Sequence, residues 1–146
     1  MKYSRFACLV MLIGAALLCV ACGASSSVNN TSSLMSNLRQ AGLRVSQDQY
    51  TTLRQPFLSV PGHLLLVNGQ RVESYDYATT AAVRADAGHI AKDACLVLTP
   101  HGQVMMDWPG PPHVFSKGDV IVLYAGTDAT ILRALKAALG TQIAGV

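Results

Sequence analysis

Charged side chains are scarce in this sequence and nearly balanced in sign. Only 13% of the 146 residues are Asp, Glu, Lys or Arg, and Glu73 is the single glutamate. The 11 basic and 8 acidic residues give a net charge of +3, and two of the cations, Lys2 and Arg5, precede the first apolar run. The rest of the chain is close to neutral. This excludes the phosphate-neutralising surface that a nucleic-acid-binding protein needs.

Cysteine is too sparse to build a disulfide framework. Cys8 and Cys19 lie in an apolar N-terminal run, Cys22 follows that run, and Cys95 is alone in the remainder. A disulfide within the folded part is therefore excluded, and its stability must come from a hydrophobic core. The Cys-x-x-Cys spacing of Cys19 and Cys22 lacks the second pair of ligands that a structural zinc site requires.

Catalytic motifs are also missing, since the chain has no Gly-x-Ser-x-Gly elbow, phosphate-binding glycine loop or His-Glu-x-x-His helix. Cys95 and His101 could form a nucleophilic pair, but a turn at His101 would leave Cys95 about 15 Å away along its strand. We therefore expect Cys95 to be a buried, inert side chain. A metal site built from His101, Asp107 and His113 lacks typical ligand spacing. No metal or cofactor is expected.

The N-terminus has the layout of an export signal. Two cations lie within Met1–Arg5, an almost unbroken apolar run covers Phe6–Leu18, and small residues lead to Cys22. The apolar run is shorter than the ~20 residues of a membrane-spanning helix. We predict that residues 1–21 are an export signal peptide.

The segment from Leu18 to Gly23, Leu-Cys-Val-Ala-Cys-Gly, resembles the lipobox of bacterial lipoproteins. The resemblance implies that Cys22 becomes the acylated N-terminus, carrying palmitate-type chains, and that a lipid holds the protein at the membrane. Gly23 stands where such proteins carry an aspartate for inner-membrane retention, so the outer leaflet or the outer membrane is the expected location. Cys19 stands where the family usually has leucine, which leaves ordinary cleavage near Ala21 or Ala24 as the alternative.

A polar tether and one domain follow the signal. Residues 22–33 are mostly Ser, Asn and Thr and predict a flexible tether after the lipidated cysteine. Residues 34–146 alternate between apolar runs and turn residues, which predicts a single α+β domain. We expect a mainly antiparallel sheet with two or three helices packed on one face.

Local patterns place the elements of this domain. Asn68-Gly69 between two apolar runs predicts a tight hairpin of His63–Val67 with Gln70–Tyr77. A helix is expected between Leu34 and Gly42, a second after a cap at Thr79 or Thr80, and a third between Asp128 and Gly140. A further strand is expected to begin at Leu43–Val45. Three more strands are expected over Cys95–Leu98, Val104–Trp108 and Val120–Ala125.

A weak internal repeat accompanies these elements. Asn68-Gly69 through Tyr75 parallels Lys117-Gly118 through Tyr124 at a spacing of 49 residues, and a histidine, His63 or His113, precedes each unit. A duplicated hairpin followed by a helix is one interpretation of this pattern.

The most distinctive stretch is Trp-Pro-Gly-Pro-Pro-His, residues 108–113. Three prolines predict a rigid loop, and rigid loops lose little conformational entropy on binding. We predict that Pro111, Pro112 and His113 bind a partner, while Trp108 either packs in the core or anchors the interface. The region from Trp108 to Gly126 resembles small exported bacterial proteins of unknown function, which implies no activity.

Two functions are consistent with the sequence. The favoured hypothesis is a non-enzymatic, lipid-anchored module that binds an envelope protein or another envelope component. The alternative is a small envelope enzyme or metal-binding protein that uses Cys95 or the histidines. Stoichiometric metal binding, or rapid reaction of Cys95 in the native protein, would favour the alternative.

Overall fold

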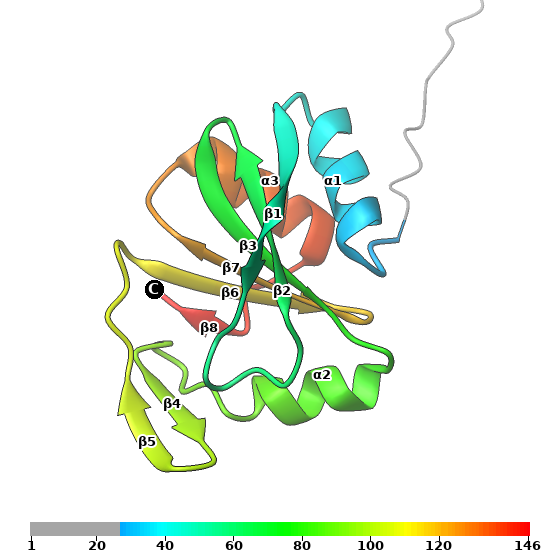
Figure 1. Ribbon diagram of the computed structural model, residues 1–146. Coiled ribbons are helices and arrows are strands. Elements are labelled where there is room, and N and C mark those ends of the chain that lie inside the picture. The colour runs from blue at the N-terminus through cyan, green and yellow to red at the C-terminus, as the bar shows by residue number, and fades with distance from the viewer. Residues whose placement is uncertain (1–26) are drawn as a thin grey trace, which may run out of the picture.

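A computed structural model describes residues 27–146 (Figure 1). The predicted signal peptide, Cys22 and the first part of the tether lie outside the described residues. The elements, in chain order, are α1 (Thr31–Gln40), β1 (Val45–Leu53), β2 (Gly62–Val67), β3 (Gln70–Asp76), α2 (Thr80–Ala87), β4 (Leu96–Thr99), β5 (Gly102–Met105), β6 (Pro112–Lys117), β7 (Val120–Ala125), α3 (Ala129–Leu139) and β8 (Ala144–Gly145). Within residues 27–146, no helix is long and apolar enough to cross a membrane.

The strands form one large antiparallel sheet and a small separate hairpin. The large sheet has the strand order β1-β2-β3-β7-β6-β8, and each neighbouring pair is antiparallel. Strands β4 and β5 pair only with each other as named strands and form the hairpin. The predicted α+β domain with a mainly antiparallel sheet is therefore confirmed.

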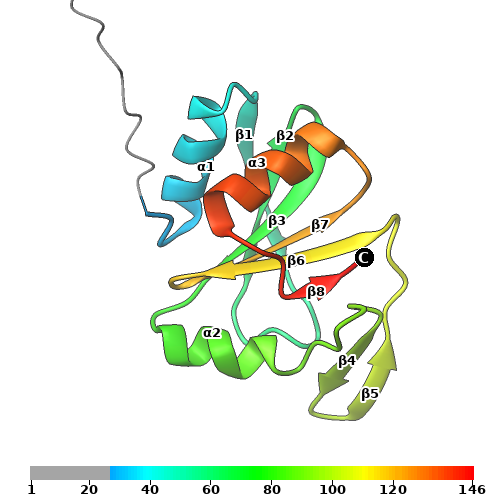
Figure 2. The same ribbon diagram turned by 180° about the vertical axis from the view of Figure 1, so that it is seen from behind.

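Helices cover both faces of the large sheet. Helices α1 and α3 lie side by side on one face, where Leu38 and Leu135 pack with Val72 and Val122. Helix α2 lies on the opposite face, and its Val83 belongs to a second core cluster. Figures 1 and 2 show the sheet between these two layers.

The expectation that all helices share one face holds for α1 and α3 but not for α2. Successive residues of a strand point to opposite faces, and the central strand β7 is buried at five consecutive positions, Val120–Tyr124. A strand that is apolar on both faces needs a cover on each. Helix α2 and the loop that carries Phe57 provide the second cover.

The β2–β3 hairpin and the β6–β7 hairpin pair their strands in the same way. Gly62 pairs with Tyr75 in the first hairpin, and Pro112 pairs with Ala125 in the second, so equivalent positions are 50 residues apart. The predicted spacing of 49 is therefore wrong for the strands. It matched Tyr75 with Tyr124, but these tyrosines lie in different core clusters, on opposite faces of the sheet.

The first of these hairpins turns at Asn68 and Gly69, as the sequence predicts. Their φ angles are 51° and 84°, and Val67 pairs with Gln70 directly across the turn. Two consecutive positive φ angles are typical of the tight hairpin turn that Asn-Gly favours. This sequence-based prediction is confirmed.

The ordered domain begins earlier than residue 34. Val28 is fully buried in the cluster beneath α1 and α3, and Asn30 caps α1 by accepting a hydrogen bond from the Ser33 backbone N–H at 2.9 Å. The Ser33 hydroxyl in turn accepts from the Asn30 backbone N–H at 3.1 Å. The polar residues assigned to the end of a tether thus form the first helical turn, because Ser and Asn are favoured as capping residues.

Candidate functional site

The predicted partner-binding residues do not form a loop. Pro112 is the first residue of β6, where a proline is tolerated, and both Pro112 and His113 are buried. Only Pro111 of the three is exposed. The predicted rigid loop is wrong for Pro112 and His113, because pairing with β7 continues to the Pro112–Ala125 pair.

His113 has partners on both ring nitrogens. Nδ1 lies 3.0 Å from Gln142 Oε1, and Nε2 lies 3.1 Å from the Gly126 carbonyl oxygen. The ring is 7% exposed and stacks on Tyr124 with a centroid distance of 6.1 Å. His113 therefore holds the C-terminal segment against β6. The described residues contain no group of three His, Cys, Asp or Glu side chains placed to bind a metal, which contradicts the His101–Asp107–His113 alternative.

Cys95 and Trp108 both lie outside the strands predicted for them. Cys95 precedes β4 and is half-buried, so the expected full burial is wrong. Trp108 lies between β5 and β6, and it is half-buried and packs against the second core cluster, the first of the two roles expected for it. Its ring meets Phe57 edge-on at 6.5 Å, and its Nε1 donates to the Ala94 carbonyl oxygen at 2.8 Å.

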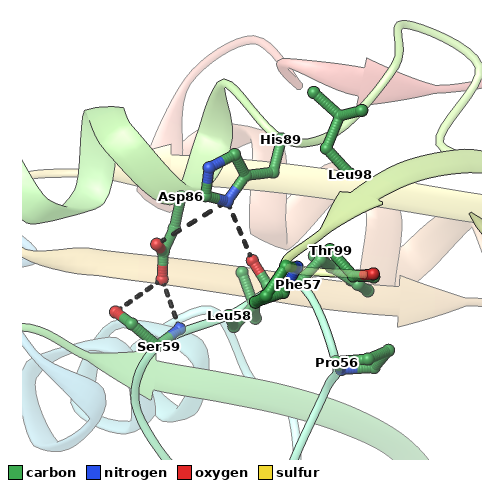
Figure 3. A pocket seen from close by; sticks show the side chains of 9 residues that line it. Pro56, Phe57, Leu58, Ser59, Asp86, His89, Leu98 and Thr99 are labelled. Carbon is green, nitrogen blue, oxygen red and sulfur yellow. Dashed lines mark hydrogen bonds and ion pairs between the residues drawn. The ribbon is translucent and has the colours of Figure 1, made fainter. Parts of the chain in front are cut away.

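A hollow of about 270 Å³ opens between α2, β4 and the loop after β1 (Figure 3). We call it the Asp86 hollow, and its lining consists of Pro56, Phe57, Leu58, Ser59, Asp86, His89, Leu98, Thr99 and Pro100. Most of these side chains are apolar. Such a lining with a few fixed polar groups is typical of a ligand-binding site.

Asp86 is the buried polar centre of this hollow. One carboxylate oxygen, Oδ2, accepts from the Ser59 backbone N–H at 2.6 Å, from the Ser59 hydroxyl at 2.8 Å and from the Tyr77 hydroxyl at 2.8 Å. Burial, followed by the hydrogen bond to Asp86, raises the pKa of Tyr77 above its usual range. Three segments of the chain are thereby tied to one oxygen atom.

His89 lies beside this carboxylate, just after the end of α2. Its Nδ1 is 3.3 Å from the Phe57 carbonyl oxygen and 3.9 Å from Asp86 Oδ1 (Figure 3). A carbonyl oxygen only accepts hydrogen bonds, so this network assigns a hydrogen to Nδ1. No described residue hydrogen-bonds to Nε2, and the His89 side chain is 45% exposed, so this nitrogen is accessible to solvent or to a ligand.

The order of these groups favours binding over covalent catalysis. A serine nucleophile needs an imidazole between its hydroxyl and the carboxylate. Here the carboxylate lies in the middle, with Ser59 donating to Oδ2 and His89 beside Oδ1. His89 is not placed to take a proton from Ser59.

Apolar side chains are exposed beside the hollow. Leu98 pairs across the hairpin with Gln103, and Leu96 pairs with Met105, so these four side chains share one face. We call this the hairpin face: Leu96, Leu98, Gln103 and Met105. Leu98 is 43% exposed and Met105 is 78% exposed. An exposed apolar patch at the rim of a hollow is typical of an interaction site.

Sequence reasoning missed Asp86, and it considered His89 only as one of the histidines that the alternative function could use. Their spacing of three residues at the end of a predicted helix was the available pattern, but the third partner, Ser59, is 27 residues away from Asp86. Comparison of the chain with known protein families, with curated proteins and with solved structures gave no match.

Proposed function

We propose that this chain is an exported, lipid-anchored domain of the cell envelope that binds an envelope protein through its hairpin face. The main support is the exposed apolar surface of Leu98 and Met105 at the rim of the Asp86 hollow. An apolar side chain of the partner would fill the hollow, and a neighbouring polar group of the partner would meet His89 Nε2. Proteins rarely leave such a surface uncovered without an interaction role.

The free edge of β5 adds to this support. Within the described chain, no strand pairs with the outer side of β5, and its four residues, Gly102–Met105, are all exposed and uncharged. Proteins commonly protect an exposed edge strand with charges or proline. An unprotected edge suits a partner that adds an extended segment by backbone hydrogen bonds.

The position of the hairpin fits a tethered protein. The N-terminal segment packs against the β6–β7 turn, where a Cβ on Gly118 would lie 3.1 Å from the Val28 carbonyl oxygen. The β4–β5 hairpin lies at the other end of the domain in both views (Figures 1 and 2). An anchor at Cys22 would therefore leave the hairpin face directed away from the membrane.

A matched pair of variants tests this function. Leu98→Asp places a charge on the hairpin face, and Leu66→Asp places one at a leucine of similar exposure, 38%, on β2. The full-length wild type and both variants are purified from detergent-solubilised membranes, their folding is checked by thermal melting, and co-purified envelope proteins are quantified. We expect a protein that is lost with Leu98→Asp and retained with Leu66→Asp. The same proteins, or none, from all three chains would contradict the proposal.

A further inference from the structure

A second hollow lies at β1, an edge strand of the large sheet. It has a volume of about 400 Å³ and lies between β1 and the start of β2. The pairing of these strands is irregular here: Asp48 pairs with Leu64, but the next pair is Thr52 with His63. Three extra residues, 49–51, bulge from β1, and we call them the Tyr50 bulge. Bulges of this kind occur frequently beside functional sites.

Asp48 fixes the shape of this bulge. Its Oδ2 accepts from the Thr51 hydroxyl at 2.6 Å, and its Oδ1 accepts from the Tyr50 backbone N–H at 2.9 Å. The Thr51 hydroxyl, followed by the Tyr50 N–H, lowers the pKa of Asp48 below its usual value. The bulge is therefore held in one conformation before any ligand binds, which reduces the entropic cost of binding.

The lining of this hollow is rich in hydrogen-bonding groups. It includes the amides of Gln47 and Gln49, the hydroxyls of Thr51 and Thr52, the Asp48 carboxylate and the ring of His63, together with Pro61 and Gly62. His63 Nε2 lies 3.7 Å from Asp76 Oδ2. Gln47 Nε2 donates to His63 Nδ1 at 3.1 Å, so these two side chains hold each other in place. No Lys or Arg lines the hollow, which makes phosphate and other anions poor ligands. Amides and hydroxyls both donate and accept, which suits a ligand with many hydroxyl groups.

Tyr50 carries an aromatic ring on the bulge; it lies between the lining residues Gln49 and Thr51 in sequence but does not itself line the hollow. Its side chain is 99% exposed and therefore makes almost no contact with the rest of the domain. An aromatic ring offers a flat apolar face together with a polar hydroxyl. The C–H face of a sugar ring stacks on such a surface while the sugar hydroxyls bind neighbouring polar groups.

We propose that the Tyr50 bulge and the adjacent hollow bind a neutral glycan. The site is distinct from the Asp86 hollow and from the hairpin face, because no residue lines it together with either of them. The amides and hydroxyls, together with the Asp48 carboxylate, supply the hydrogen bonds, and the exposed ring of Tyr50 supplies the stacking surface.

Calorimetric titration of the full-length protein in detergent tests this proposal, with chitotetraose and cellotetraose as probes. We expect saturable binding of at least one of them, about tenfold weaker binding for Tyr50→Ser, and retained binding for Tyr50→Phe, which keeps the ring. Inorganic phosphate is expected not to compete. Tyr50 is exposed, so neither variant should change the melting temperature, which serves as the folding control.

Absence of saturable binding of both glycans to the wild type would overturn the proposal. Equal binding by wild type and Tyr50→Ser, or displacement of the glycan by phosphate, would also overturn it. The hairpin-face variant Leu98→Asp should bind glycan as the wild type does, so the two proposals fail separately.

Discussion

At the scale of single residues, Asp86 joins parts of the chain that are distant in sequence. Its carboxylate links Ser59 in the loop after β1 with Tyr77 after β3, and it is itself part of α2. Buried polar groups stabilise a fold only when their hydrogen bonds are complete. Within the described chain, every buried side-chain nitrogen and oxygen has a partner.

We expect Asp86→Ala to lower the free energy of unfolding by about 3 kcal/mol, because it leaves the Tyr77 hydroxyl and the Ser59 N–H without their acceptor. Asp86→Asn keeps an acceptor oxygen and should cost only about 1 kcal/mol. Urea unfolding measures both values. Asp107→Ala, at an exposed aspartate whose side chain makes no hydrogen bond or ion pair with the described residues, is the control and should change stability by less than about 0.5 kcal/mol. Equal losses for all three variants would contradict this role.

Buried tyrosines make stability sensitive to alkaline pH. Burial, followed by hydrogen bonds to Glu73 and Asp86, raises the pKa values of Tyr75 and Tyr77 above the usual 10.0. A raised pKa in the folded state means that stability is present at lower pH and is lost as pH rises above the unfolded value. We expect Tyr75→Phe/Tyr77→Phe to flatten this loss in urea unfolding measured across pH 10.0, whereas Tyr50→Phe, at an exposed ring, should not.

At the scale of elements, α1 is fastened to the sheet by its first residue. The Thr31 N–H and hydroxyl donate to Asp76 Oδ1 at 2.8 Å and 2.9 Å, and the hydroxyl also lies 2.7 Å from Ser74 Oγ. A carboxylate at a helix N-terminus interacts favourably with the helix dipole. Asp76 at the end of β3 therefore acts as an additional cap on α1.

Asp76→Ala should loosen α1 by about 1 to 2 kcal/mol through loss of this cap. Hydrogen exchange, read separately for each helix, measures the effect. We expect amide protection to fall in α1 while α3, which is capped by its own Asp128, keeps its protection. A uniform fall in both helices would show that Asp76 acts on global stability instead.

Elements with strong local patterns could be predicted from the sequence. Thr79 and Asp128 cap α2 and α3, and Asn68-Gly69 forms the hairpin turn. Strand β1 could be predicted only at its first residue. It is a polar edge strand without alternating apolar residues, and it is interrupted by the Tyr50 bulge. Edge strands that face solvent lack the burial pattern on which such predictions depend.

The candidate sites could not be predicted, because their residues meet only in the folded chain. The Asp86 hollow combines Phe57, Asp86 and Leu98, which lie on three separate segments. Tight spacing in the sequence was also misleading. Pro111, Pro112 and His113 suggested a loop, but strand pairing buries the last two.

At the scale of the whole molecule, the first described residues and the proposed binding surface lie at opposite ends of the domain (Figures 1 and 2). We expect Cys22→Ser to move the full-length protein from the membrane fraction to soluble fractions, because the proposed lipid would then be absent. Fractionation followed by mass spectrometry of the N-terminus measures this. A native N-terminus at Ala24 or Ser25 without lipid would contradict the anchor.

The central claim is that the hairpin face binds an envelope protein, and site-specific photo-cross-linking in intact cells tests it most directly. A photoreactive amino acid replaces Met105 on the hairpin face or, as a control, the exposed Arg133 on α3. We predict a discrete adduct with one envelope protein from position 105, its loss when Leu98→Asp is added, and no such adduct from position 133. No adduct at position 105, or the same adduct from both positions, would contradict the claim.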